Sequence, residues 1–249
     1  MIDKKIIEKV KNATYIVTIP DSNPTNKGFP VPNGTGFFIS KNGYFITARH
    51  VLEQNSDKET LIENKDIILT KPEGHYVDRM VLVKDWKNFD LVLLKTDFSF
   101  HKNKIGFEKK EGFDYLLISF EVIPEGTDIF SFGYPLSKAR LDLSNPSAKV
   151  GYHFISPRIT SAIISSHYEE IGPVTFSGFP KKYVIDKALN YGNSGGPVVL
   201  NENGNVISVC ASFQPVMIPQ SSGSVMIPSL YGISTSLKCV ESDLRSIIE

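Results

Sequence analysis

The sequence predicts an all-β protein with one short helix at each end. Many short stretches rich in apolar residues are separated by turns containing glycine or proline, a pattern typical of antiparallel strands. Apolar residues at helical spacing, interleaved with charge, begin the chain over residues 1–12 and end it over 241–249. With 249 residues, 41% of them hydrophobic, the chain can bury one large core or two small ones.

The first half contains the elements of one barrel. Residues 13–19 alternate as a strand does, and residues 20–32 form a loop rich in proline, asparagine and serine. Two strands then flank the turn Lys41-Asn42-Gly43, which predicts a hairpin. A brief helical turn is expected over residues 50–54. Further strands are expected over the segments 61–69, 76–84 and 90–96.

The second half contains the elements of another barrel within the same single domain, 1–249. We expect residues 101–112, rich in lysine and glutamate, to link an N-terminal barrel at 13–110 to a C-terminal barrel at 111–240. The expected strands are 115–118, 127–133, 150–165 and 174–176. The sequence Val-Met-Ile-Pro occurs at 216–219 and again at 225–228, and its simplest interpretation is the two strands of a hairpin.

One loop carries an exposed nucleophile pattern, Gly192-Asn193-Ser194-Gly195-Gly196. Glycines on both sides allow a tight turn that projects the serine hydroxyl while neighbouring N–H groups converge beside it. Acyl transfer needs this combination of a nucleophile and donors aimed at the developing oxyanion. Taken alone, the motif is equally compatible with a polar loop that enters a strand.

The rest of the chain supplies a base and a carboxylate. His50 lies at the far end of the predicted hairpin, and Asp90 opens the apolar run 91–94. Each residue alone has an ordinary structural explanation, as a surface histidine or a turn aspartate. The order histidine, aspartate, serine, each in its own flanking pattern, favours a catalytic triad. Asp85 and Asp97 compete for the role of the carboxylate.

These motifs together resemble those of a known family. The segments GTGFFISKNGYFITARHV, DLVLLK, ITSAIIS and DKALNYGNSGGPVV are similar to the histidine, aspartate, barrel-entry and serine motifs of chymotrypsin-fold serine proteases. The motifs match best those of the bacterial high-temperature-requirement and glutamyl endopeptidase types, over residues 13–240. The resemblance implies two antiparallel six-stranded β-barrels with the active site in the cleft between them. Since the sequence ends at Glu249, it implies a version without a PDZ domain.

The resemblance also implies a role for each site residue. His50 would be the general base, Asp90 its orienting partner and Ser194 the nucleophile of a serine endopeptidase that forms an acyl-enzyme. The loop Gly192, Asn193 and Ser194 would form the oxyanion hole through the N–H groups of its first and last residues. The substrate pocket would be lined by Ala188, Leu189, Cys210, Ala211, Ser212, Phe213 and Gly232.

The expected pocket carries no charge, which favours cleavage after small or medium apolar residues. Trypsin-like enzymes place aspartate where Ala188 lies, and glutamyl endopeptidases place histidine where Cys210 lies. If this alignment were shifted by two positions, Asp186 would restore a preference for basic residues. The alternative function is a catalytically silent protease fold that acts as a binding or scaffold module.

Composition narrows the partners and the compartment. Lysine plus arginine equals aspartate plus glutamate, 27 of each, so net charge gives no sign of a nucleic-acid or membrane partner. Histidine and cysteine spacing suggests no metal site and no cofactor. The two cysteines make no disulfide framework, and no apolar run has the length of a signal peptide or membrane span. We therefore expect a soluble, cytoplasmic protease that acts on proteins or peptides.

The sequence also suggests how activity is controlled. Digestive relatives carry aspartate where Asn193 lies, and pair it with a newly cut N-terminus; here a charged helix begins the chain. We therefore expect control by loop rearrangement rather than by zymogen cleavage. The segments 216–228 and 175–186 should be the most mobile parts near the site. Substrate or a regulatory protein partner would then fix the peptide between Gly192 and Asn193 in its competent orientation.

Overall fold

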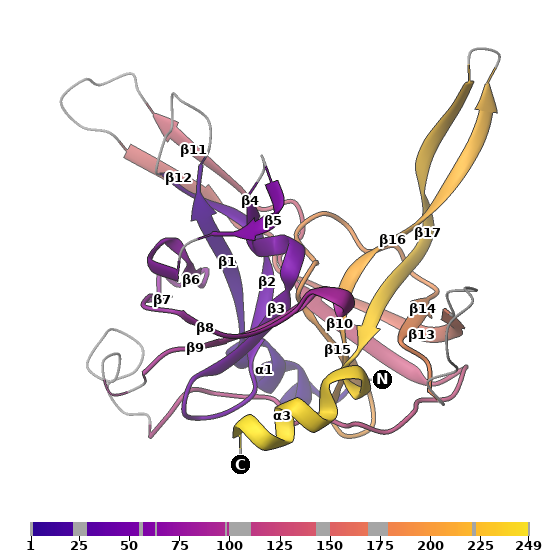
Figure 1. Cartoon of the computed structure of the whole chain (residues 1–249), viewed down its shortest axis with the longest axis horizontal. Coiled ribbons are helices and arrows are strands. Elements are labelled where there is room, and N and C mark those ends of the chain that lie inside the picture. The colour runs from indigo at the N-terminus through magenta and orange to yellow at the C-terminus, as the bar shows by residue number, and fades with distance from the viewer. Residues whose placement is uncertain are drawn as a thin grey trace.

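The protein consists of two β structures side by side, with both helices packed at one end (Figure 1). The computed structural model describes residues 2–21, 29–54, 57–62, 64–97, 99, 111–142, 150–168, 179–220 and 223–248. The prediction of an all-β, chymotrypsin-like double-barrel fold with terminal helices is confirmed. Of the two six-stranded barrels expected, only the C-terminal one is a closed six-stranded barrel, whereas the N-terminal half is a curled sheet of seven strands. Within the described ranges, no helix is long and apolar enough to cross a membrane.

The N-terminal half is a curled, half-barrel sheet of seven strands. It follows helix α1 (Lys4–Ala13), and its strand order is β7-β6-β1-β2-β3-β9-β8. The strands are β1 (Thr14–Pro20), β2 (Pro30–Phe38), β3 (Tyr44–Ala48), β6 (Ile68–Thr70), β7 (Tyr76–Val77), β8 (Val81–Trp86) and β9 (Leu91–Lys95). A separate pair is formed by β4 (Glu53–Gln54) and β5 (Asp57–Leu61). Short 3₁₀ turns η1 (Arg49–Leu52), η2 (Asn64–Asp66) and η3 (Lys87–Phe89) connect these strands.

The C-terminal half is a closed six-stranded barrel, in the order β10-β13-β14-β17-β16-β15. Its strands are β10 (Asp128–Gly133), β13 (Arg158–Tyr168), β14 (Lys182–Ile185), β15 (Pro197–Leu200), β16 (Val206–Gln220) and β17 (Gly223–Ser236). A hairpin of β11 (Lys138–Asp142) and β12 (Val150–Phe154) stands outside it. The 3₁₀ turn η4 (Leu237–Val240) leads into helix α3 (Glu241–Ile248).

A shared apolar core joins the two halves. Ile16 and Phe37 of the N-terminal sheet lie in one buried cluster with Phe130 and Val199 of the barrel. Leu244 of α3 belongs to the same cluster, so the C-terminal helix packs on this core as its apolar spacing predicts. Separate clusters fill the interior of each half. The cleft between the halves is therefore held by buried hydrophobic contacts.

The expected elements match the structure with local differences. The hairpin β2–β3 and both helices are found as predicted, but residues 115–118 make only an isolated bridge, between Ile118 and Val206. The expected strand 150–165 is broken into β12 and β13, and 61–69 includes the turn η2. Strand β14 is not among the predicted strands. Most of the expected linker 101–112 and the expected strand 174–176 lie outside the described residues.

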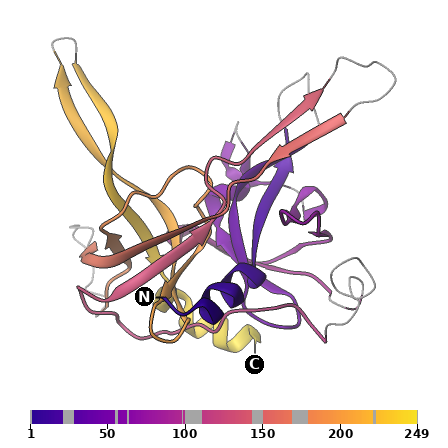
Figure 2. The ribbon, with the colours of Figure 1, turned by 180° about the vertical axis from the view of Figure 1, so that it is seen from behind.

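Two hairpins project from the same end of the molecule (Figures 1 and 2). One is β11–β12, and the other is the outer part of β16–β17, which extends well beyond the barrel. In the second hairpin the two Val-Met-Ile-Pro sequences pair with each other, Val216 opposite Ile227 and Ile218 opposite Val225. The interpretation of the repeat as the two strands of a hairpin is confirmed.

Candidate active site

The turn after β3 positions His50 against Asp90. His50 lies in η1, directly after the hairpin, and its backbone N–H donates to Asp90 Oδ1 at 2.9 Å. Its ring Nδ1 lies 2.7 Å from Asp90 Oδ2. Asp90 ends η3 with φ of 55°, in the left-handed region that aspartate tolerates, and its carbonyl accepts the N–H of Arg49 at 2.9 Å. Both oxygens of the Asp90 carboxylate are thus held by His50, one by its backbone N–H and the other by its ring.

Among the described residues, neither Asp85 nor Asp97 forms a hydrogen bond or ion pair with the imidazole of His50. Asp85 lies 3.0 Å from Nε of Arg49, whose side chain is only 4% exposed, and Nη1 of that arginine lies 2.6 Å from Glu53. Asp97 accepts from the backbone and hydroxyl of Ser99. Asp90 is therefore the carboxylate that the fold brings to His50.

The surroundings of His50 favour its protonated form. Burial by itself would lower the pKa of the imidazole, since a charged ring loses water. The hydrogen bond and negative charge of Asp90, helped by the charge of Glu53, outweigh that effect and raise the pKa above its usual value. Asp90 thus stabilises the imidazolium that a general base becomes.

The serine loop is held in a conformation that needs glycine. Gly192 has φ of 95°, and a Cβ there would lie 2.6 Å from the carbonyl oxygen of Tyr134. Thr35 of β2 donates its hydroxyl to the Gly192 carbonyl at 2.6 Å and its N–H to the Ser194 carbonyl at 2.8 Å. The N–H of Asn193 donates to Asn190 at 3.0 Å. The loop from one half is therefore bonded to a strand of the other.

Two backbone N–H groups of this loop remain available. Among the hydrogen bonds of the described residues, the N–H groups of Gly192 and Ser194 donate none. The carbonyl of Tyr191, which could otherwise compete for them, accepts from Leu136 at 2.9 Å. The Ser194 hydroxyl donates to the carbonyl of Ala211 at 3.3 Å.

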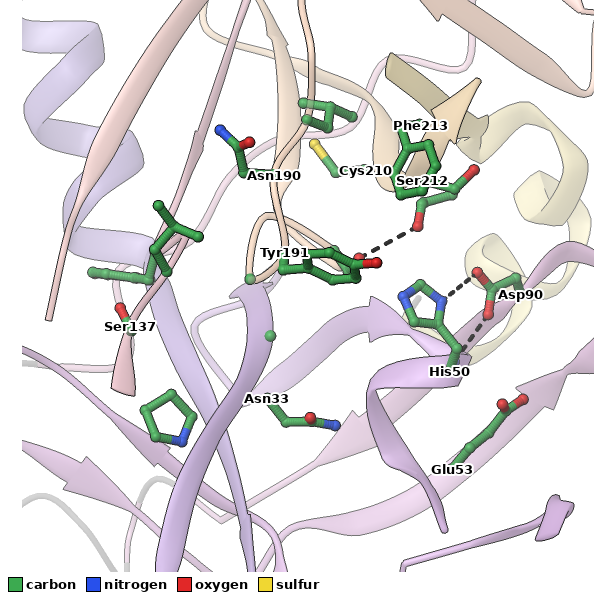
Figure 3. Close-up of a pocket in the computed structure, with 18 of the residues that line it drawn as sticks. Asn33, His50, Glu53, Asp90, Ser137, Asn190, Tyr191, Cys210, Ser212 and Phe213 are labelled. Atoms are coloured by element: carbon green, nitrogen blue, oxygen red, sulfur yellow. Dashed lines mark hydrogen bonds and ion pairs between the residues drawn. The ribbon is translucent and has the colours of Figure 1, made fainter. Parts of the chain in front are cut away.

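A cavity of about 690 Å³ joins these groups (Figure 3). Its lining includes His50, Asp90 and Ser194. Five of the predicted pocket residues also line it: Leu189, Cys210, Ala211, Ser212 and Phe213. Of the other predicted pocket residues, Ala188 does not line it, and Gly232 lies behind Leu189, whose Cγ would be 2.5 Å from an added Cβ. Asn193 is buried, 4% exposed.

The part of the cavity wall that is formed by Leu189, Cys210, Ala211, Ser212 and Phe213 carries no charged side chain. Burial raises the pKa of the Cys210 thiol to about 12, despite a hydrogen bond with Ser131 that acts the other way, so the thiol stays neutral. Asp186 is occupied elsewhere, since its Oδ1 accepts the N–H of Ile163 at 2.9 Å. The rings of Tyr191 and Phe213 meet edge to face, 6.3 Å apart, beside the cavity.

Several lining residues are not predicted by the sequence. They are Pro32, Asn33, Gly34, Glu53, Tyr134, Leu136, Ser137, Lys138, Asn190 and Tyr191. Tyr191 and Asn190 adjoin the serine motif and could have been found from that position. The others come from segments such as β2, β4 and β11 that only the fold brings to the cleft. Within the described ranges, no three histidine, cysteine, aspartate or glutamate side chains gather as metal ligands would.

The chain is similar to known protein families and sequences. Residues 34–209 match the model of the trypsin-like peptidase domain. A "Probable periplasmic serine endoprotease DegP-like" of Rhizobium meliloti is 28% identical over 220 residues, which are 87% of this chain and 34% of the relative. "Serine protease HTRA2, mitochondrial" of Bos taurus is 24% identical over 82% of this chain and 37% of its own length. The chain thus spans about a third of the length of these relatives.

Solved structures share the fold. The chain resembles "HtrA-type protease AlgW with decapeptide" with a TM-score of 0.60 and 18% identity, over 98% of this chain and 66% of that one. It resembles the serine endoprotease from Yersinia pestis with a TM-score of 0.59 and 17% identity, over 98% of this chain and 65% of that one. The resemblance to the high-temperature-requirement type is confirmed.

The expected cytoplasmic location is wrong by this comparison. The relatives from Rhizobium, Bartonella and Brucella are all named periplasmic proteases. The expectation depended on the lack of an apolar leader in the sequence and on the cysteine count. Neither observation reports the compartment, because a leader is removed from a mature protein and a protein without disulfides is stable in either environment.

Proposed function

The chain belongs to the trypsin-like peptidase family, and from that premise we propose that it is a serine endopeptidase acting through His50, Asp90 and Ser194. The observation that carries the proposal is one cavity lined by all three residues, with the imidazole of His50 bonded to Asp90. His50 and Asp90 come from one half of the molecule and Ser194 from the other. A substrate bound in the cleft would therefore meet the nucleophile and the base together.

The reaction begins with the Ser194 hydroxyl. Its Oγ attacks the peptide carbonyl carbon while Nε2 of His50 takes the proton, and Asp90 holds the other ring N–H. The resulting imidazolium then gives this proton to the leaving amine, which leaves Ser194 acylated. Water, deprotonated by the same ring, releases the acyl group and restores the serine.

Before attack, the hydroxyl of Ser194 must turn from Ala211 to His50. Its 3.3 Å bond to the Ala211 carbonyl is long, so its loss costs little. Catalytic hydrogen bonds are commonly loose before substrate arrives and tighten in the complex. We propose that this rotation, together with substrate binding, brings the Ser194 hydroxyl to His50.

The developing oxyanion would be bound by the N–H groups of Gly192 and Ser194. Support comes from the absence of other acceptors for these two groups among the described residues, and from the Tyr191 carbonyl, which is bonded to Leu136. Asn193, between them, fixes the turn through its buried side chain and its bond to Asn190. Such prearranged donors typically contribute about 100- to 1,000-fold each to the rate.

We further propose cleavage after small or medium apolar residues. The support is the neutral Cys210 thiol beside Leu189 in the cavity wall, with the ring of Phe213 near them. The alternative of a basic preference through Asp186 is disfavoured, because that carboxylate does not line the cavity and accepts a backbone N–H. A polypeptide substrate agrees with the similar solved structure that is named as an HtrA-type protease with a decapeptide.

A fluorophosphonate probe tests the catalytic proposal. It should label the wild-type chain and leave Ser194→Ala and His50→Ala unlabelled, with both variants folded by circular dichroism. Asp90→Asn should lower the labelling rate by about 10⁴-fold, and Asp97→Asn, a matched change away from His50, should not. Unlabelled wild type in all conditions would favour the silent scaffold.

A peptide library tests the specificity proposal separately. Peptides with alanine, valine or leucine before the scissile bond should be cleaved in preference to those with arginine, lysine or glutamate. A profile dominated by arginine or lysine would overturn the assignment of the pocket and point to Asp186.

A further inference from the structure

The projecting outer part of β16–β17 presents an apolar face that the catalytic proposal leaves without a role. Val216, Ile218, Val225 and Ile227 share one face of this hairpin, because Val216 pairs with Ile227 and Ile218 with Val225. Each is 38–43% exposed. We call these four residues the arm face.

The arm face is uncharged as well as apolar. No charged residue occurs anywhere between Val206 and Ser236, although 22% of the chain is charged. Contiguous exposed apolar surface on a water-soluble fold marks a binding site more often than a chance arrangement. Its ligand should therefore be apolar and need carry no charge.

The arm face shares a strand with part of the cavity wall. Cys210, Ala211, Ser212 and Phe213, which line the cavity, belong to the same strand β16 as Val216 and Ile218. At about 3.3 Å per strand residue, Val216 lies about 10 Å beyond Phe213. A ligand that leaves the cavity along β16 reaches the arm face within a few residues.

The shared strand favours the substrate polypeptide as the occupant of the arm face. In the proposed complex, the substrate residue that supplies the scissile carbonyl places its side chain in the cavity beside Cys210 and Phe213. The substrate chain N-terminal to this residue then continues along β16. The leaving amine must lie on the side of His50, which protonates it. The arm face is therefore reached by the N-terminal side of the substrate.

Recognition on the arm must rely on side chains. Pro215 and Pro219 carry no N–H, so two backbone donors of β16 beyond Phe213 are missing and extended pairing with another strand is interrupted. Apolar side chains of the substrate would instead contact the aliphatic groups of Val216 and Ile218.

We propose that the arm face is an exosite that binds an apolar stretch of the polypeptide substrate, N-terminal to the cleaved bond. The inference relies on the proposed endopeptidase function. It makes β16 a single recognition strand, with the cavity wall at one end and the exosite at the other. The protease should therefore select substrates with an apolar stretch about four to nine residues before the scissile bond. At about 3.3 Å per residue, a stretch at this position spans the arm.

The test compares two fluorogenic peptides with the same cleavage site. One is extended at its N-terminus by an apolar stretch of valine and isoleucine, the other by glycine and serine. Wild type should cleave the apolar peptide with about tenfold higher kcat/KM, mainly through lower KM, which corresponds to about 1.4 kcal/mol. In Val216→Thr/Ile218→Thr the ratio should fall to about one, since threonine keeps the strand shape and removes apolar surface.

The matched control is Val81→Thr/Val83→Thr, which changes two exposed valines of β8 away from the cavity. It should keep the tenfold ratio. The exosite is overturned by a wild-type ratio of one, by an unchanged ratio in Val216→Thr/Ile218→Thr, or by a preference for apolar extension on the C-terminal side.

Two further measurements separate the competing outcomes. If neither peptide is cleaved, the endopeptidase proposal fails, and anisotropy of the labelled apolar peptide with Ser194→Ala then tests the exosite by binding alone. Equal binding by Ser194→Ala with and without the threonine changes rejects it. Sedimentation that shifts from dimer to monomer in Val216→Thr/Ile218→Thr, at an unchanged cleavage ratio, would assign the arm face to a second copy of the chain.

Discussion

At the scale of single residues, the site depends on opposing effects on one imidazole. Burial disfavours the charged form of His50, while Asp90 and Glu53 favour it, and the second effect is larger. Glu53 lines the cavity, but among the described residues it forms no hydrogen bond with Ser194. It influences the pKa of His50 through its negative charge. Its contribution is therefore separable from that of Asp90.

The first prediction concerns pH. Because the pKa of His50 is raised, its neutral, active form should appear only above the ordinary histidine value of 6.5, and kcat/KM should rise through that region. Glu53→Gln removes a negative charge, lowers the pKa and should shift this acid limb to lower pH. The limb is measured as kcat/KM against pH. A limb unmoved in Glu53→Gln would show that Glu53 does not influence the base.

The second prediction compares two glycines with positive φ. Gly192→Ala adds backbone strain at φ of 95° and a Cβ 2.6 Å from the Tyr134 carbonyl, so the loop must shift. We expect kcat to fall about 100-fold or more. Gly74→Ala is the control, since its φ is 83° and no atom lies within 4 Å of the added Cβ. Comparable kcat losses in both variants would mean that strain, rather than the oxyanion loop, limits activity.

At the scale of elements, the turn η1 is fixed by a buried arginine. Arg49 precedes His50, and its side chain is only 4% exposed. It pairs with Glu53, directly after the turn, and with Asp85 on β8. This ion pair network ties the turn that carries the base to the neighbouring strand. A buried charge loses more than an exposed one when its partners are removed.

The third prediction compares this arginine with an exposed one. Arg49→Met should lower the free energy of unfolding by about 2 kcal/mol, as loss of charge-assisted hydrogen bonds does. Arg245→Met removes an exposed i,i+4 pair with Glu241 on α3 and should cost less than about 0.5 kcal/mol. Urea unfolding measures both. Equal effects would contradict a special role for the buried network.

The fourth prediction concerns the outer part of the β16–β17 hairpin, residues 216–228. We expect its amide hydrogens to exchange faster than those of the barrel strands, and we expect this exchange to slow when substrate binds. Fast exchange is expected because few contacts from other elements cover these strands, whereas the barrel strands are paired on both sides. Hydrogen exchange followed by mass spectrometry measures this directly. Exchange as slow as that of β10, with the oxyanion hole already formed, would instead indicate a constitutively active protease.

At the scale of the whole molecule, one buried threonine couples the two halves. The Thr35 hydroxyl on β2 donates to the carbonyl of Gly192 and accepts the N–H of Tyr134 at 3.1 Å. A flip of the peptide between Gly192 and Asn193 would have to break the first of these bonds. The oxyanion loop is therefore stabilised by the other half of the protein.

The fifth prediction tests this coupling. Thr35→Val keeps the shape but leaves the Gly192 carbonyl and Tyr134 N–H without this partner, so we expect a loss of about 2 kcal/mol of stability and at least a tenfold loss of kcat. Thr18→Val, which removes a buried bond to Ile68 far from the serine loop, should lower stability alone. The measurements are urea unfolding and kcat. Unchanged kcat in Thr35→Val would show that the loop holds its shape without the N-terminal half.

The sequence by itself determined the fold class, the terminal helices and the hairpin leading to His50, and it predicted the members of the candidate triad. These follow from local patterns, since strand alternation, turn glycines and the serine motif are each written within a few consecutive residues. Only the tertiary structure placed the carboxylate of Asp90 against the ring of His50, left Ala188 and Gly232 out of the cavity lining, and brought Asn33, Glu53 and Leu136 into it. It also paired the two Val-Met-Ile-Pro segments into an exposed arm. Such contacts join residues far apart in the chain, and their formation depends on how both halves pack around a shared core rather than on any local preference.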